Sequence, residues 1–275
     1  MKIHHLNCGS LCPCGGKLPK SIFPSELVCH CLMIESEQGL ILIDSGLGKK
    51  DIENPKRLGL ISSILGIKKD LKLSAIDQIK NLGFSKNDVR HIIPTHLDLD
   101  HAGGINDFPN AIVHTSKSEY SSALFPKSIN EKTRYRQSNW NENTKWQIYD
   151  DKAKSYGEKW FGFNSVREVE GLPSDILLIP LPGHSKGHFG IAIQNNEGWL
   201  LHAGDSYFNT NEISLNRKPL LGLSIFQRLI HQSYKNAINN QQQLIRLKNS
   251  ESKVKIICSH DLEKYKNSIK NSLIA

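Results

Sequence analysis

The chain has 275 residues, 38% of them hydrophobic and 23% charged, which is typical of a folded globular protein. No apolar run approaches the ~20 residues of a membrane span, and the N-terminus lacks the apolar core of a secretion signal, so we expect a cytoplasmic protein with no membrane partner. The net charge of +8 suits an anionic substrate or nucleic acid. The scattered placement of the lysines and arginines argues against nucleic acid.

The first third of the chain predicts a strand pair followed by a helix. Residues 26–34 and 40–43 have the apolar character of strands and are separated by a turn at Gln38-Gly39, so we expect a hairpin. Asp44 follows directly, either as a turn residue or as an acceptor that orients a metal-bound histidine. Helical spacing of apolar residues predicts a helix between residues 74 and 82, and residues 89–93 are predicted to form the next strand.

Cysteine is concentrated at the start of the chain. Five of the six cysteines fall within the first 31 residues and include two C-x-C pairs. Because this spacing is weaker evidence for zinc than paired C-x-x-C motifs, we expect free thiols rather than a thiolate metal site.

The most informative stretch is 95–104, which places four potential metal ligands within six residues: His96, Asp98, Asp100 and His101. No helix or strand interior points all four side chains one way, so we expect a loop mounted on the preceding strand. A solvated turn in which Asp100 caps a helix explains a carboxylate but not both histidines. Two imidazoles and two carboxylates suit zinc, iron or manganese better than calcium.

After a predicted strand at 111–114 and a helix at 116–124, the composition changes. Residues 125–171 contain three of the four tryptophans, interleaved with lysine and arginine. We predict a single domain over residues 1–275 in which 125–171 is an inserted helical cap near the site, its aromatic residues forming an apolar pocket wall. The alternative is that these aromatic residues make a small core of their own.

Later segments repeat the pattern of a buried strand followed by a histidine or aspartate. Predicted strands at 176–179, 199–202 and 254–258 precede His184, Asp205 and His260, and a helix is expected at about 226–247. Because strand ends at one edge of a layered α/β domain can converge, these three residues are candidates to complete a metal site with the 96–101 stretch.

Taken together, the motifs resemble the metallo-β-lactamase superfamily. They occur in family order over nearly the whole chain: Asp44-Ser45-Gly46, His96-x-Asp98-x-Asp100-His101 with Gly103-Gly104, Gly183-His184 with Lys186-Gly187-His188, Gly204-Asp205 and Ser259-His260. The resemblance implies a four-layer αβ/βα sandwich with two divalent transition metal ions at one edge. It implies a first ion held by His96, Asp98 and His184, a second held by Asp100, His101 and His260, and Asp205 as the bridge between them.

One ligand departs from the family pattern, which most often has histidine where this chain has Asp98. Zinc is the metal that the resemblance implies. The harder, anionic oxygen ligand makes iron or manganese the alternative.

Within the superfamily, residues 76–120 resemble the N-acyl-homoserine lactonases. This resemblance implies a small-molecule substrate and a metallo-hydrolase in which a hydroxide shared by two metal ions attacks a lactone or ester carbonyl. Asp100 would orient the hydroxide and pass a proton to the leaving group, and Tyr207 would contact the carbonyl. Two alternatives stay open: a glutathione-thioester hydrolase of the glyoxalase II type, and a non-catalytic metal-binding sensor or scaffold. The oligomeric state is not indicated.

Overall fold

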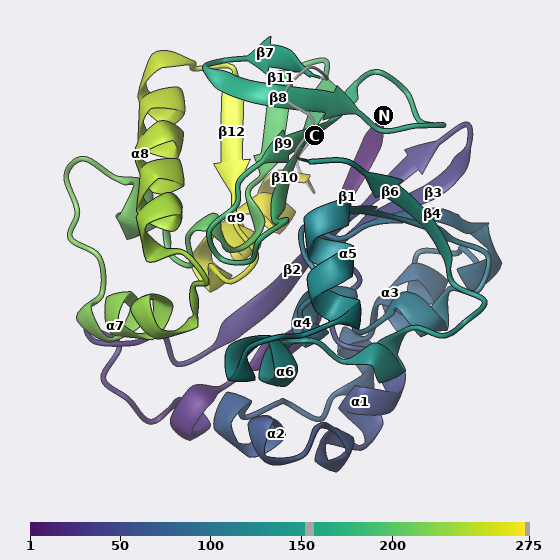
Figure 1. The fold of residues 1–275 in the computed structure, drawn as a ribbon, viewed down its shortest axis with the longest axis horizontal. Helices are drawn as coiled ribbons and strands as arrows, with labels where there is room; N and C mark the ends of the chain where they lie inside the picture. Colours follow the sequence, from purple (N-terminus) through teal and green to yellow (C-terminus); the bar gives the residue numbers. More distant parts are fainter. Residues whose placement is uncertain (152–156, 273–275) are drawn as a thin grey trace.

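The computed structural model describes residues 1–151 and 157–272 of the chain. Two six-stranded sheets face each other and helices cover their outer faces, so the chain folds as the expected four-layer αβ/βα sandwich (Figure 1). The strand order is β1-β2-β3-β4-β5-β6 in the first sheet and β12-β11-β10-β9-β8-β7 in the second. The first sheet is antiparallel from β1 to β3 and parallel from β3 to β6, whereas the second is parallel only between β11 and β12.

The strands of the first sheet are β1 (Lys2–Leu11), β2 (Leu27–Ser36), β3 (Gly39–Ile43), β4 (Val89–Ile93), β5 (Ile112–Ser116) and β6 (Lys145–Tyr149). Those of the second are β7 (Glu158–Trp160), β8 (Phe163–Glu168), β9 (Ile176–Pro180), β10 (Phe189–Asn195), β11 (Gly198–His202) and β12 (Val254–Ile257). The α-helices are α1 (Lys49–Glu53), α2 (Leu60–Leu65), α3 (Ala75–Asn81), α4 (Leu99–Ala102), α5 (Lys117–Leu124), α6 (Ile129–Arg134), α7 (Leu221–Ile230), α8 (Tyr234–Ser250) and α9 (Leu262–Ser272). Among these helices, none combines the length and apolar character that crossing a membrane requires.

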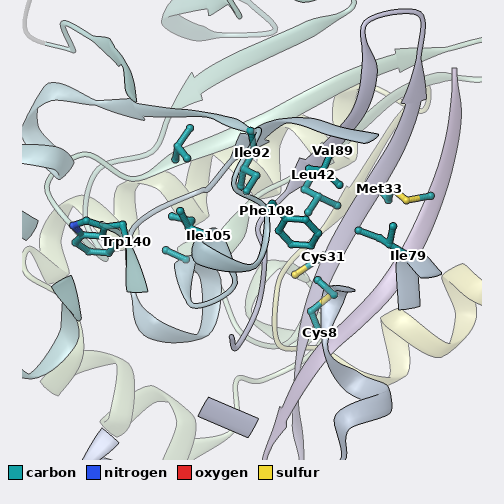
Figure 2. Close-up of a cluster of buried hydrophobic side chains, with 14 of the residues drawn as sticks. Cys8, Cys31, Met33, Leu42, Ile79, Val89, Ile92, Ile105, Phe108 and Trp140 are labelled. Atoms are coloured by element: carbon teal, nitrogen blue, oxygen red, sulfur yellow. The ribbon is translucent and has the colours of Figure 1, made fainter. Parts of the chain in front are cut away.

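The alternation of side chains along β2 and β3 builds two separate cores. Leu32 and Ile34 on β2 point between the sheets, where they join a cluster with strands of the second sheet. Cys31 and Met33 point the other way and pack with Leu42 beneath α3 (Figure 2). Both faces of these strands are therefore buried, which explains why the sequence is apolar at consecutive positions instead of alternating with polar residues.

Residues 125–171 differ from the helical subdomain that we expected. Among the described residues of this stretch, 125–151 and 157–171, only α6 and a short 3-10 turn are helical. Strand β6 completes the first sheet, and β7 and β8 extend the second. The aromatic residues follow this division, since Trp140 belongs to the core of the first sheet and Trp160 and Phe163 belong to that of the second. These three side chains are therefore core residues of two sheets and not a pocket wall.

The helix predicted at 226–247 is interrupted at residues 231–233, between α7 and α8. The backbone N–H groups of Gln232 and Ser233 leave the helical pattern and donate to the carbonyls of His184 and Gly183, at 3.1 and 2.9 Å. This break fastens the α7–α8 junction to one of the predicted ligand loops.

Candidate metal centre

The seven predicted ligands come together at the edge of the sandwich where four strands end. His96 follows β4, His184 follows β9, Asp205 follows β11 and His260 follows β12. The 95–104 stretch is not entirely a loop, because the four-residue helix α4 carries Asp100 and His101. Asp98 precedes that helix as its N-cap residue, but its side chain makes no capping hydrogen bond and turns toward the site instead.

The carboxylate of Asp205 lies at the centre of this cluster. Its Oδ2 is 3.2 Å from His260 Nε2, 3.5 Å from His184 Nε2 and 3.9 Å from His96 Nε2. Its Oδ1 is 3.3 Å from His101 Nε2. The Asp205 carboxylate therefore lies within 3.9 Å of the Nε2 atom of each of four imidazoles.

The side chains around Asp205 fall into two groups. The first group is His96, His184 and Asp205, and the second group is Asp100, His101 and His260. Within each group, the three potential ligand atoms, one from each residue, lie within 4.8 Å of one another. Asp98 adds a carboxylate beside the first group, with Oδ2 3.1 Å from His184 Nε2 and 3.3 Å from His96 Nε2.

All four histidines are held by their other ring nitrogen. Nδ1 of His101 lies 2.8 Å from Asp44 Oδ2, and Nδ1 of His260 lies 2.8 Å from the carbonyl oxygen of Val28. Nδ1 of His96 contacts the hydroxyl of Thr95 at 3.0 Å, and Nδ1 of His184 contacts Nδ1 of His231 at 3.1 Å. A hydrogen bond at Nδ1 fixes the ring orientation and leaves the lone pair of Nε2 free to coordinate a cation. Of the two readings for Asp44, the structure supports the acceptor.

The electrostatics of the cluster favour anionic carboxylates. Burial raises the pKa of Asp205, but His260 and His101 outweigh this effect and hold the pKa well below its usual value. Burial lowers the pKa of His101, yet the carboxylates of Asp205 and Asp44 reverse the effect and raise it well above 6.5. Burial also lowers the pKa of His260, and Asp205 reverses the effect and raises it in the same way. A divalent cation bound here would compensate the carboxylates in place of such protons.

Arg134, which the sequence motifs did not indicate, accompanies Asp98. Its Nη1 lies 3.3 Å from Asp98 Oδ2, and the guanidinium is nearly fully buried. Burial opposes ionisation of Asp98, but Arg134 and then His96 hold the pKa of the carboxyl well below its usual value. The charge that distinguishes aspartate from histidine at position 98 is therefore neutralised by a residue of α6.

The prediction that Tyr207 contacts the substrate does not fit its position. Its ring is fully buried in the core of the second sheet, where it packs with residues of α8 and β12. The next residue, Phe208, faces the site instead. Its ring stacks on His260 at a centroid distance of 4.9 Å and meets His184 edge-on at 6.0 Å. The backbone after Asp205 therefore turns the phenol away and presents a ring without a hydroxyl group.

Two further buried residues that the sequence analysis did not assign tie the ligand loops together. Glu119 accepts from the backbone N–H groups of Leu97 and Gly187 and from the hydroxyl of Ser185, at 3.0, 3.1 and 2.6 Å. His188 Nε2 accepts from the backbone N–H of Asp205 at 3.0 Å. Both residues lie within motifs of the family resemblance, Lys186-Gly187-His188 and Ser118-Glu119-Tyr120, but the resemblance assigned them no role, and each acts on backbone geometry.

Four imidazoles and three carboxylates at one edge of an αβ/βα sandwich are the composition of a metallo-hydrolase site. The chain belongs to the metallo-β-lactamase superfamily, because the sequence model described as "Metallo-beta-lactamase superfamily" matches residues 24–260. It is a metallo-hydrolase of that family.

Known relatives and structures agree with this assignment. The chain is 32% identical over 266 residues to a "Probable metallo-hydrolase" of Mycobacterium tuberculosis, covering 96% of this chain and 82% of that protein. It is 27% identical to the N-acyl homoserine lactonase AiiA of Bacillus thuringiensis subsp. kurstaki over 215 residues, 74% of this chain and 76% of the lactonase. A crystal structure of Bacillus thuringiensis AiiA with N-decanoyl-L-homoserine bound at its active site has a TM-score of 0.71 at 20% identity, covering 97% of this chain and 95% of that one. At this identity the likeness shows the fold.

Proposed function

We propose that the chain binds two divalent metal ions and hydrolyses a lactone or a related carboxylic ester. The observation that carries the proposal is the convergence of four Nε2 atoms on the Asp205 carboxylate, each ring being held from behind at Nδ1. Such an arrangement directs the Nε2 lone pairs toward one space, where they can coordinate a cation.

The residues fit a metal on independent grounds. His96 Nε2, His101 Nε2 and Asp205 Oδ1 are buried and make no hydrogen bond of good geometry within the described residues, although His96 Nε2 lies 3.3 Å from Asp98 Oδ2 and His101 Nε2 lies 3.3 Å from Asp205 Oδ1. Buried polar atoms in a folded protein are nearly always satisfied, and each one left without a partner costs about 1–3 kcal/mol. Three buried atoms that approach one another without forming hydrogen bonds are explained together if cations lie between them.

We assign the ligands in two sets. His96, His184 and Asp98 would hold one ion, and Asp100, His101 and His260 the other. Asp205 would reach both, since its two oxygens approach rings from both sets. The pairing of Arg134 with Asp98 makes the first set electrically similar to a set of three imidazoles, which favours zinc over iron or manganese.

When bound, the two ions would polarise a substrate carbonyl and lower the pKa of a shared water toward neutrality. We assign the proton transfer of that water to Asp100. Its Oδ2 lies 3.7 Å from His260 Nε2 and 3.8 Å from His101 Nε2, and its side chain is 14% exposed whereas those of the two histidines are at most 2% exposed. It therefore lies on the solvent side of the cluster, where it could accept the proton and deliver it to the leaving oxygen.

The choice of a lactone rests on the relatives, several of which are N-acyl homoserine lactonases. A glutathione thioester is the second candidate, and the net charge of +8 is the observation that favours it.

The test compares metal-loaded parent protein with Asp100→Asn on acyl homoserine lactones, aryl esters and glutathione thioesters. Asp175→Asn serves as the control, because Asp175 is exposed and lies in the turn before β9. We expect lactone opening in the parent and the control, and a loss of at least about 100-fold in Asp100→Asn. Undiminished turnover by a metal-loaded Asp100→Asn protein contradicts the mechanism. Metal binding without turnover on any of these substrates favours the sensor or scaffold alternative.

A further inference from the structure

Three segments far apart in the sequence form one continuous surface: residues 12–25, 54–69 and 214–231. Their buried side chains share a single cluster that includes Phe23, Leu58 and Leu223. Backbone hydrogen bonds join them as well, from Cys12 N to the carbonyl of Gly66 at 3.0 Å and from Gly222 N to that of Ile22 at 3.1 Å. In Figure 1, α2 and α7 mark this side of the molecule. We call it the basal face.

The basal face exposes large apolar side chains in an ordered pattern. On α7, Leu221, Ile225 and Leu229 are spaced four residues apart and are 67%, 54% and 74% exposed. This spacing aligns them along one side of the helix, while the other side packs into the cluster beneath. Four more exposed apolar side chains lie on the same three segments: Leu18, Ile22, Ile64 and Leu215.

Positive charge predominates on the basal face, although Glu26, Glu53 and Asp70 lie directly beyond the ends of its segments. The three segments contain nine exposed cations, and their sequences contain no aspartate or glutamate. The cations are Lys17, Lys20, Lys56, Arg57, Lys68, Lys69, Arg217, Lys218 and Arg228. Within the described residues, Arg57 alone among them forms an ion pair, with Asp51 at 3.2 Å. Elsewhere the chain mixes both signs, so this face concentrates the positive charge.

We propose that the basal face binds the surface of an anionic lipid bilayer. A row of protruding leucine and isoleucine side chains flanked by unpaired cations is the combination that inserts shallowly between anionic headgroups. A second copy of the chain fits less well, because a symmetric dimer through this face would bring two sets of predominantly positive charges together. This inference departs from the expectation of no membrane partner, which considered only segments that span a bilayer.

The basal face also adjoins the candidate metal centre. Helix α7 ends at Ile230, whose carbonyl oxygen accepts from Arg134 Nη2 at 2.7 Å, and the next residue, His231, contacts His184. Phe226 on α7 meets Phe208 edge-on at 6.1 Å. If the proposed function holds, docking would bring the site to the interface from which a lipophilic acyl substrate arrives. The docking itself does not depend on the reaction.

The test is co-sedimentation of the full chain with vesicles of phosphatidylcholine alone or mixed with phosphatidylglycerol in equal parts. We expect binding to the mixed vesicles, weakened by salt. The apolar variant Leu221→Glu/Leu229→Glu and the charge variant Arg217→Gln/Lys218→Gln should each reduce the partition coefficient at least about tenfold. Their matched controls lie elsewhere on the surface: Ile148→Glu on β6, and Lys145→Gln/Lys159→Gln on β6 and β7.

The controls should bind like the parent. Circular dichroism confirms the fold of each variant, and no catalytic assay enters the test, so failure of docking is distinct from failure of the proposed function. Equal binding by the Leu221→Glu/Leu229→Glu variant overturns the proposal. So does a concentration-dependent dimer, detected by light scattering, that Ile225→Glu dissociates, because the face would then be occupied by a second copy.

Discussion

The pairing of Asp98 with Arg134 can be tested by a double-mutant cycle. Asp98→Asn leaves the guanidinium buried without its carboxylate, and Arg134→Gln leaves the carboxylate without its cation. If the pair is a unit, each single change destabilises the metal-free protein, and the double change costs less than the sum of the two. This coupling is expected because Arg134 neutralises the charge of the aspartate at position 98.

The size of the effect follows from the geometry. Nη1 and Oδ2 are 3.3 Å apart. At an effective dielectric constant of ~20, two unit charges at this distance attract by about 5 kcal/mol. Removing one partner of a buried pair typically costs about 3–5 kcal/mol. We therefore expect each single variant to lose about 3 kcal/mol of unfolding free energy and the cycle to show a coupling of about 2 kcal/mol or more.

Urea unfolding of metal-free protein measures all four corners of the cycle. The control is the surface pair Lys255 and Glu197, whose side chains are 66% and 65% exposed although their atoms are 2.5 Å apart. This pair should show no resolvable coupling, since solvent screens it. Additive losses at Asp98 and Arg134, equal to those of independent sites, refute the reasoning.

Two other residues give independent predictions. His231→Phe removes the partner of His184 Nδ1 and should weaken the binding of one zinc ion about 10–100-fold in a competition titration. His231→Gln should restore part of this affinity. An unchanged zinc affinity in His231→Phe contradicts a role for His231 in positioning His184. Burial lowers the pKa of His114 to about 3 in the folded protein. Between pH 6.5 and about pH 3, His114 is therefore protonated in the unfolded chain but neutral in the folded one. The unfolding free energy should fall by about 1.4 kcal/mol for each pH unit of acidification across this range. Urea midpoints of His114→Gln should depend less steeply on pH than those of the parent, and parallel curves contradict this assignment.

Much of the site was predictable because its ligands follow strands. A strand pattern such as 89–93 can be recognised locally, and strands that run in the same direction deliver the residues after their ends to one edge of a sheet. The motif around His96 and the later residues His184, Asp205 and His260 could therefore be placed together from their order in the chain. The structure brings these residues to one cluster.

The residues that sequence analysis missed act through long-range contacts. Arg134 belongs to a helix whose own sequence shows no metal motif, and His231 lies 47 residues from its partner His184. The short edge strand β6 mixes polar and aromatic residues, so its composition suggested a cap instead of a sheet edge. Tyr207 and Phe208 are adjacent aromatic residues, and only the backbone turn after Asp205 decides which of them faces the imidazoles.

The most direct test of the central claim is the number of zinc ions bound per chain, measured by elemental analysis after equilibrium dialysis of the parent and of Asp205→Asn. Because Asp205, alone among the described side chains, reaches both ligand sets, we predict two ions per chain in the parent and at most one in the variant. A parent that binds no zinc, or a variant that still binds two ions as tightly as the parent, contradicts the account.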